Sequence, residues 1–284
     1  MLSYVTAIFL GMLQGITELF PVSSLGHSVI APKLFHLSLN QNAPYFLTFL
    51  VATHAATALV LFLFFFSDWK KIIAGFLRSL KNREIHEDDT YAKLAWLLIV
   101  GTIPAGLLGV LFEDILKNLF ASPQLVAGVL VLNGLLLLTA EQLGKKKNQK
   151  SGTEGSDRRI AKLSWKQTLL VGILQCLALI PGFSRTGSAM TGGLLTGLSH
   201  EDSGRFAFLL ATPIIAGAAL VKLPELASDQ SSIGPTIVGA VFAGVSAYFS
   251  VTFLVKYFQT KTLLLFALYC MIAGLLVSGF FLFR

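Results

Sequence analysis

The stretch GMLQGITELFPVSSLGHSVI, residues 11–30, is apolar except for a few side chains whose types could do chemistry: Gln14, Glu18, Ser23, Ser24 and His27. Pro21 predicts the end of one helix, and Ser23 is a suitable N-cap for the next. Ser24 and His27 are then three residues apart on one helical face, where a hydroxyl and an imidazole become neighbours. Gln14 and Glu18, four apart on the preceding helix, could meet that pair across the turn. This spacing favours a nucleophile with a neighbouring base.

A second polar stretch, PGFSRTGS at residues 181–188, offers groups suited to an anion. Gly182 and Gly187 permit a close approach of the backbone, while Ser184 and Arg185 offer a hydroxyl and the guanidinium fork that fits phosphate best. Broken helices that meet inside a membrane also aim amide-bearing N-termini at a common point, which favours phosphate. Together the two stretches predict a nucleophile, a base and a phosphate clamp.

Each of these residues also has a structural interpretation. A lone serine in a membrane helix usually bonds to its own backbone, a histidine can satisfy a buried carbonyl, and an arginine can extend to the membrane surface. Glu18 is different, because it is the only carboxylate in either stretch and an ionisable group at membrane depth is functional by default. We expect His54 to pack or to hydrogen-bond between helices, and the other histidines to lie in loops or interfaces: His36, His86 and His200.

The composition places these residues in a membrane. Of 284 residues, 54% are hydrophobic and 13% charged, and the mean hydropathy is +0.72. Two stretches, 3–35 and 166–198, are interrupted by Pro, Gly and Ser, so each predicts a re-entrant pair of short helices. The predicted fold class is an all-α integral membrane protein. Its six transmembrane helices are expected in the runs that reach roughly 20 apolar residues: 44–66, 91–112, 122–143, 204–223, 234–256 and 262–283.

Basic residues predict the orientation of the spans. The loop 67–93 holds six of the 22 Lys and Arg residues and the stretch 144–166 holds eight, so both should be cytoplasmic. Six spans then place both termini outside. The net charge of +7 is thereby a signal of topology. We expect no nucleic-acid partner, because no basic stripe is interleaved with exposed aromatic residues.

The two halves of the chain resemble each other. GMLQGITELFPVSSLG from Gly11 and GILQCLALIPGFSRTG from Gly172 share Gly, Leu and Gln in order, then Pro, then Ser at the same distance from it. FLVATHAATALV from Phe49 similarly matches FLLATPIIAGAALV from Phe208. Because three spans separate the broken segments, the halves must be inverted in the membrane. We predict one integral membrane domain with a first inverted repeat, a polar cytoplasmic linker and a second inverted repeat, at 1–143, 144–165 and 166–284.

Three segments carry a resemblance to a known family: QGITELFPVSSLGH (14–27), PGFSRTGS (181–188) and FAFLLATP (206–213). They resemble the signature segments of the bacterial undecaprenyl-diphosphate phosphatases, also called bacitracin-resistance proteins. The resemblance covers essentially the whole chain. It implies a multi-pass protein of the bacterial inner membrane that hydrolyses a polyprenyl diphosphate to the monophosphate. This product is the lipid carrier recycled for peptidoglycan synthesis.

The resemblance also suggests roles. We expect Ser24 to attack the terminal phosphorus, His27 to manage its proton, and Glu18 to orient His27 or hold a cation. His27 as the nucleophile, with Ser24 as a phosphate ligand, fits the spacing equally well. The expected substrate-binding residues are Gln14, Ser23, Ser184, Arg185, Gly187 and Ser188.

Two positions depart from the family pattern. The first motif often has two glutamates, and the first of them is Gln14 here. A threonine common in the second motif is replaced by Ala189, with Ser188 immediately before it. Since Gln carries no charge, we do not expect Gln14 to act as a general base or as a strong cation ligand. We expect no tightly bound cofactor. A divalent cation, Mg²⁺ or Ca²⁺, to which the resemblance points, would lean on Glu18 and the diphosphate oxygens.

An alternative function comes from the predicted architecture. Inverted repeats with broken helices are typical of secondary transporters, so the chain could be a polyprenyl-phosphate flippase. A flippase does not need the Ser, His and carboxylate groups, whereas hydrolysis does. The glycine-rich segment GAVFAGVSAYF from Gly239 permits close helix packing within one bundle or between subunits, which leaves a homodimer open.

Overall fold

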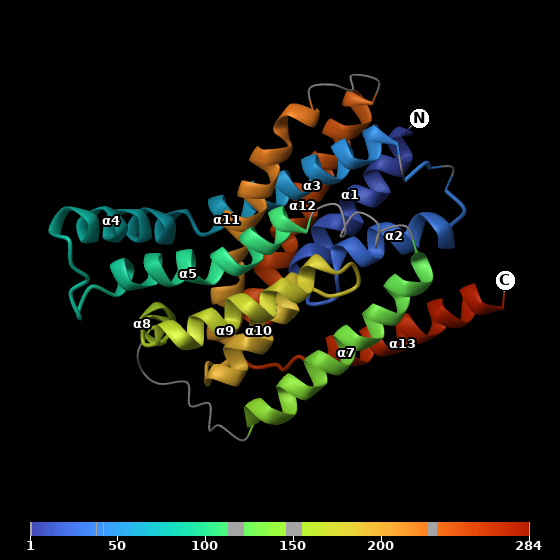
Figure 1. Cartoon of the computed structure of the whole chain (residues 1–284). Helices are drawn as coiled ribbons and strands as arrows, with labels where there is room; N and C mark the ends of the chain where they lie inside the picture. Colours follow the sequence, from blue (N-terminus) through green and yellow to red (C-terminus); the bar gives the residue numbers. More distant parts are fainter. Residues whose placement is uncertain are drawn as a thin grey trace.

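The computed structural model describes residues 2–37, 39–41, 43–112, 122–145, 155–226 and 232–283, and these form a bundle of helices (Figure 1). Six helices among them are long and apolar enough to span a membrane. They are α3 (Pro44–Phe64), α5 (Thr90–Leu111), α7 (Pro123–Lys145), α11 (His200–Leu226), α12 (Ile233–Tyr257) and α13 (Leu264–Leu282). The six predicted spans are confirmed, and the chain is a multi-pass membrane protein.

The two interrupted stretches fold as short helices on either side of a break. The first contains α1 (Tyr4–Leu19) and α2 (Ser24–Leu34). The second contains α9 (Trp165–Gln175), the 3-10 turn η1 (Cys176–Leu179) and α10 (Arg185–Thr196). None of the four α-helices exceeds 16 residues, fewer than a span needs. The helix pairs are therefore confirmed, while their re-entrant course stays a prediction.

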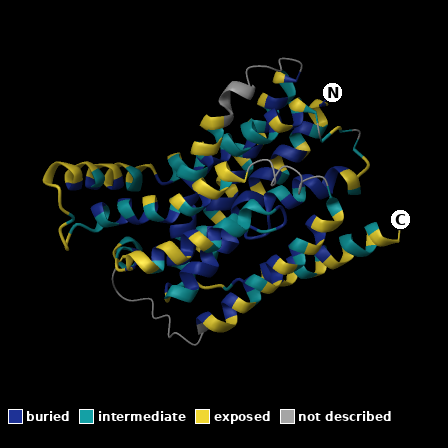
Figure 2. Ribbon diagram, in the orientation of Figure 1, coloured by how far each residue is buried: buried dark blue, intermediate teal, exposed yellow. Residues whose placement is uncertain are grey.

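The burial pattern is that of a helix bundle in lipid. Buried residues gather on the sides of the helices that face each other, and exposed residues lie on the outside (Figure 2). Many of the exposed residues are large and apolar. Leu107, Phe249 and Leu276, for example, are 59–69% exposed on three different spans. Such a surface would be unfavourable in water, but lipid tails are as apolar as these side chains.

Small residues set the packing of α1. A Cβ atom on Gly11 would lie 2.2 Å from the carbonyl oxygen of Gly239, and one on Gly15 would lie 2.1 Å from that of Ala243. The glycine-rich face of α12 thus contacts α1 within the same chain. A homodimer stays a prediction.

The first basic loop contains a helix that the sequence analysis did not predict. α4 (Phe66–Asn82) follows α3 directly and packs on α5. The indole of Trp96 on α5 donates a hydrogen bond of 2.9 Å to Ser79 Oγ on α4. Its buried positions are Ile72, Gly75 and Ser79, spaced three and four apart, with basic side chains on the opposite side. The basic residues of this loop concealed the periodicity.

The predicted linker is also partly helical. α8 (Ser156–Ala161) buries Ile160 fully, and Arg159 Nε donates to Asp202 of α11 over 2.7 Å. The linker is therefore not solvated throughout, because the apolar and ionic contacts of α8 hold it on the bundle. Residues 146–154 of the predicted linker lie outside the described residues.

The arrangement of the ends agrees with the predicted topology. Both termini lie on one side of the bundle, and the α4–α5 connection and α8 lie on the opposite side (Figure 1). The two basic loops thus share one side, as the distribution of Lys and Arg requires. Which side is cytoplasmic, and the division of the chain into inverted repeats, stay predictions.

Candidate active site

The two breaks lie beside each other, held by one side chain of α7. Asn133 Nδ2 donates to the carbonyl oxygen of Pro21 at 3.1 Å, and Asn133 Oδ1 accepts from the amide of Ser184 at 3.0 Å. Ser23 Oγ in the first break accepts from the amide of Gly182 in the second at 3.2 Å. The two polar motifs, about 160 residues apart, therefore form one site.

Both half-helices begin at a serine cap. Ser23 Oγ accepts from the amide of Gly26, and Ser184 Oγ accepts from the amide of Gly187, each at 3.1 Å. Ser23 has φ 70°, a conformation that costs an L-residue roughly 1–2 kcal/mol. The first two amides of each half-helix have no intrahelical acceptor, which leaves them for an anion.

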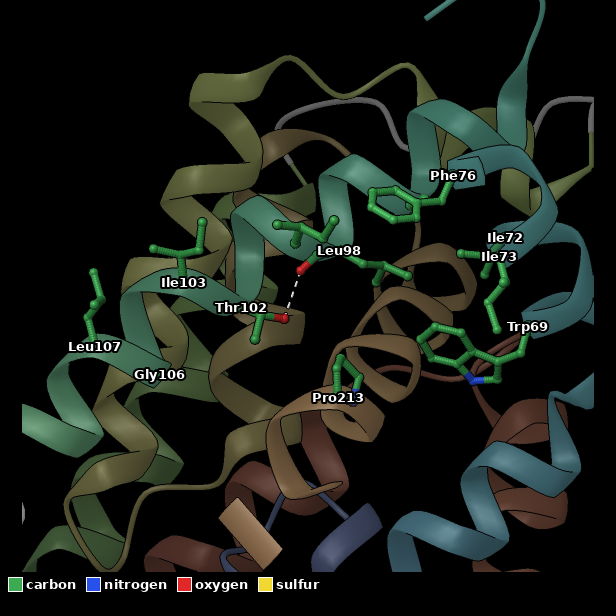
Figure 3. Close-up of a pocket in the computed structure, with 12 residues that line it drawn as sticks. Trp69, Ile72, Ile73, Phe76, Leu98, Thr102, Ile103, Gly106, Leu107 and Pro213 are labelled. Atoms are coloured by element: carbon green, nitrogen blue, oxygen red, sulfur yellow. Dashed lines mark hydrogen bonds between the residues drawn. The ribbon is translucent and has the colours of Figure 1, made fainter. Parts of the chain in front are cut away.

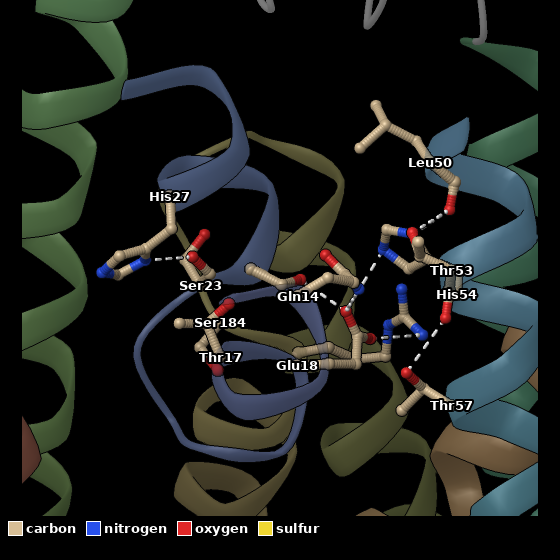
Figure 4. Close-up of polar contacts among 12 residues, drawn as sticks. Gln14, Thr17, Glu18, Ser23, His27, Leu50, Thr53, His54, Thr57 and Ser184 are labelled. Atoms are coloured by element: carbon tan, nitrogen blue, oxygen red, sulfur yellow. Dashed lines mark hydrogen bonds and ion pairs between the residues drawn. The ribbon is translucent and has the colours of Figure 1, made fainter. Parts of the chain in front are cut away.

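Glu18 is the centre of the site, and donors from four helices surround its carboxylate (Figure 4). Its Oε2 accepts from Gln14 Nε2 at 2.9 Å and from the hydroxyl of Ser24. The same oxygen lies 3.2 Å from Nε2 of His54, and Oε1 lies 3.4 Å from Nη1 of Arg185. A carboxylate that is 5% exposed needs such partners, because an unpaired buried charge is costly.

His54 is a site residue that the sequence analysis missed. The expected interhelical contact exists, but the partner of His54 is the carboxylate of the site. Its Nδ1 lies 2.7 Å from the carbonyl oxygen of Leu50. Each ring nitrogen of His54 therefore faces an acceptor oxygen, a carbonyl on one side and a carboxylate on the other. The signal was present: the rule that an ionisable group at membrane depth is functional applies to His54 as it does to Glu18.

His27 was expected to be bonded to Ser24 and oriented by Glu18, but the structure gives its ring nitrogens other partners. Its Nδ1 lies 2.7 Å from the carbonyl oxygen of Ser23, and its Nε2 lies 2.7 Å from the hydroxyl of Tyr269 on α13. The ring is directed away from Glu18 (Figure 4). The physical reason is that a helical side chain leans toward the N-terminus of its helix, here onto the carbonyl four residues back.

The remaining predicted residues line the same region or support it. Gly182 has φ 110°, and a Cβ atom there would lie 2.7 Å from the carbonyl oxygen of Val126. Among the buried polar atoms of the described residues that have no hydrogen-bond partner, three belong to predicted site residues: Gln14 Oε1, Arg185 Nη1 and Ser188 Oγ. Arg185 Nη1 is the atom that faces Glu18 Oε1 at 3.4 Å. Buried polar atoms are nearly always bonded, so Gln14 Oε1 and Ser188 Oγ are available to a ligand.

An apolar cavity elsewhere contrasts with this site. It measures about 510 Å³ and lies between α4, α5 and α11 (Figure 3). No ionisable side chain lines it, and its one hydroxyl, that of Thr102, donates to the carbonyl of Leu98 at 2.7 Å. The cavity lacks the groups that hydrolysis requires.

Comparison with known proteins agrees with the geometry. A sequence profile of the family described as bacitracin resistance protein BacA matches residues 7–276. The chain belongs to this family. The expected resemblance is confirmed.

Relatives in the bacitracin resistance family match at full length. Undecaprenyl-diphosphatase of Mycolicibacterium paratuberculosis is 45% identical, with 96% of this chain and 95% of the relative covered. Undecaprenyl-diphosphatase 1 of Burkholderia pseudomallei is 42% identical, with 98% and 96% covered. Undecaprenyl-diphosphatase 2 of Frankia alni is 39% identical, with 98% and 97% covered.

In this member of the bacitracin resistance family, the residues around Glu18 do not fit a resident divalent cation. Mg²⁺ and Ca²⁺ take about six or more oxygen ligands. Glu18 instead faces the nitrogen donors of Gln14, His54 and Arg185, and among the described residues no three His, Cys, Asp or Glu side chains gather where they could hold a metal. We therefore assign no residue to a bound cation.

Proposed function

We propose that the protein hydrolyses undecaprenyl diphosphate to the monophosphate and inorganic phosphate. One observation carries the proposal: the buried carboxylate of Glu18 receives the hydroxyl of Ser24 and lies 3.4 Å from the guanidinium of Arg185. A hydroxyl, a proton acceptor and a cation are thereby collected where two half-helices begin. The names of the relatives support the lipid diphosphate as substrate. The product returns to peptidoglycan synthesis, and its formation confers bacitracin resistance.

The geometry suggests the order of events. Ser24 Oγ attacks the terminal phosphorus as its proton passes to Glu18 Oε2, the bond from phosphorus to the bridging oxygen breaks, and the lipid monophosphate leaves. Glu18 passes this proton to the bridging oxygen of the leaving monophosphate and is a carboxylate again. Water then attacks the phosphoserine as Glu18 takes one of its protons, the bond from phosphorus to Ser24 Oγ breaks, and Glu18 returns the proton to Ser24 Oγ. Arg185 and the half-helix amides neutralise the non-bridging oxygens.

His54 and Arg185 lie on either side of the Glu18 carboxylate during this reaction. They lie 3.2 Å and 3.4 Å from its two oxygens. The guanidinium of Arg185 balances the charge of the buried carboxylate, and His54 gives it a polar neighbour. Gln14 Oε1 and the hydroxyl of Ser188, which have no hydrogen-bond partner among the described residues, are then available to water and to the substrate.

We propose that any Mg²⁺ or Ca²⁺ used in hydrolysis is bound through the diphosphate oxygens and not by Glu18. The nitrogen donors around Glu18 support this. Equilibrium dialysis of the substrate-free protein against Ca²⁺ should then detect no tight site. One ion bound per chain at micromolar Ca²⁺ and lost in Glu18→Gln would contradict it.

We also propose which membrane holds the protein and how the chain is oriented in it. The protein lies in the bacterial inner membrane with both termini outside the cytoplasm, which the basic residues of 67–93 and 144–166 support. Cysteines introduced into these two loops should react with an impermeant thiol reagent only after the cells are opened. Labelling in intact cells would contradict this orientation.

Phosphate release tests the function itself. Purified protein in detergent has no two sides, so a polyprenyl-phosphate flippase, the alternative, would release nothing there. We expect inorganic phosphate from undecaprenyl diphosphate with the parent protein and at least about a hundredfold less with Ser24→Ala. No release by a folded parent protein would contradict the proposed function.

A further inference from the structure

We propose that His27 and Tyr269 form a brace that holds Ser23 in its positive-φ conformation and thereby aims Ser24 at Glu18. In this account both brace residues are positioning residues, and neither attacks phosphorus nor takes the proton of Ser24. The proposal rests on the proposed function, because it assigns a task to two residues of the same site.

Ser23 needs support from its surroundings. Its φ of 70° lies in a region that L-residues rarely adopt, and only two other non-glycine residues among those described share a positive φ. Ser23 is 2% exposed, and its hydroxyl accepts amides from both breaks, those of Gly26 and Gly182. A conformation of this kind persists only where neighbouring contacts impose it.

His27 supplies the contact on the carbonyl side of Ser23. The carbonyl oxygen accepts from the backbone amide of His27 at 3.2 Å and from its Nδ1 at 2.7 Å. The direction of this peptide group sets the start of α2, and Ser24 is the first residue of that helix. Fixing the carbonyl therefore fixes the side chain that follows it.

Tyr269 supplies the contact on the other side of the imidazole. It lies 242 residues away on α13, its hydroxyl is 2.7 Å from Nε2 of His27, and the two rings are 9° from parallel with centroids 5.8 Å apart. Since Nδ1 donates to a carbonyl, the neutral ring accepts the tyrosine proton at Nε2. Both ring nitrogens are thus occupied, and neither is available for attack.

The same stretch of α13 contacts the break a second time. Cys270 Sγ is 3.3 Å from Asn133 Nδ2, the group that also donates to the carbonyl of Pro21. Tyr269 and Cys270 therefore approach the first break from one helix at two points. Tyr269 is 45% exposed, so its place at the site depends on these two contacts of α13 with the break.

Substitutions at position 27 separate the brace from chemistry by His27. Asparagine places an amide donor where Nδ1 is and can bond the Ser23 carbonyl, but it has no atom at the place of Nε2. Alanine has neither. We expect His27→Asn to keep kcat within about tenfold of the parent and His27→Ala to lose about a hundredfold, since removing the donor frees Ser23.

Tyr269→Phe tests the second half of the brace by removing one oxygen. We expect kcat to fall about fivefold, the effect of one hydrogen bond, with KM unchanged because the substrate contacts are intact. In the His27→Asn background the same change should have no further effect, because asparagine has no Nε2 to support. Tyr248→Phe, which removes a hydroxyl from a 53% exposed tyrosine on α12, is the matched control and should equal the parent.

The assays should be run on detergent-purified full-length protein whose unfolding temperature matches the parent within a few degrees. His27→Asn as inactive as His27→Ala would overturn the brace and assign chemistry to His27. His27→Ala as active as the parent would also overturn it, as would Tyr269→Phe indistinguishable from Tyr248→Phe. The failure of the proposed function is distinguishable, because in that case the parent itself releases no phosphate.

Discussion

The starts of α2 and α10 share a backbone plan but differ in chemistry. Residues 23–27 read Ser-Ser-Leu-Gly-His and residues 184–188 read Ser-Arg-Thr-Gly-Ser, and in each the first serine caps the amide of the glycine. The first helical residues are then Ser24 and Arg185, and both contact Glu18. One half-helix therefore contributes a hydroxyl and the other a cation to the same carboxylate.

The caps define this correspondence better than the prolines do. Counted from the prolines, Ser24 matches Ser184, but the structure uses Ser184 as a cap and leaves Ser24 free to contact Glu18. Glu18 has no equivalent acidic residue in the second half, where the aligned position is Leu179. One active site thus forms from two similar helix starts because they carry different side chains.

Glu18→Gln changes the residue that both half-helices contact, and we expect it to lower turnover more than any other substitution. Glutamine has the shape of glutamate but takes no proton, and loss of a general base typically costs 10²- to 10⁴-fold. Phosphate release should fall about a thousandfold in a protein that still folds. Near-native turnover would show that Ser24 needs no carboxylate.

Arg185→Ala removes the contribution of the second half-helix. Loss of a preorganised charged donor typically costs on the order of a hundredfold in rate, and we expect at least that loss in kcat. Arg185→Lys keeps the charge but not the planar fork, so it should recover only part of the rate. If both variants are folded and turn over like the parent, α10 does not complete the active site.

His54 tests the asymmetry between the halves, since the aligned residue in the second half is Pro213. His54→Leu removes a donor from the buried carboxylate, and we expect a loss of roughly tenfold in kcat. His54→Gln keeps a donor near Glu18 and should lose less. Steady-state kinetics of the two variants would decide, and equal losses would mean that hydrogen bonding by residue 54 is irrelevant.

Ser188→Ala should have the smallest effect and would sharpen the comparison. Ser188 occupies the place in α10 that His27 has in α2, and its buried hydroxyl has no partner among the described residues. If this hydroxyl binds the substrate, its removal should raise KM about fivefold and leave kcat unchanged. An unchanged KM would assign Ser188 to packing.

Local patterns in the sequence were sufficient for much of the fold. The six spans, the two broken segments and the Ser23 cap follow from hydropathy and from proline and serine positions, which act over a few residues. α4 was not predicted because its composition is rich in lysine, although its buried residues recur at helical spacing. A charged loop can still hold an amphipathic helix, because its few apolar residues recur at helical spacing.

The site was predicted in composition but not in its contacts. Glu18, Ser24 and Arg185 lie together as expected, whereas His27 was expected beside Ser24 and instead bonds Tyr269. Helical spacing shows which residues share a face, but a rotamer is chosen by partners that can be 242 residues away. Contacts of this kind follow only from the tertiary packing.

The most direct measurement is to trap labelled phosphate on the enzyme. Undecaprenyl diphosphate labelled at the terminal phosphorus would be mixed with the purified protein, the reaction stopped within milliseconds, and the modified residue mapped. The account predicts an acid-stable phosphoserine at Ser24 that is absent from Ser24→Ala. An acid-labile phosphohistidine at His27 would contradict it.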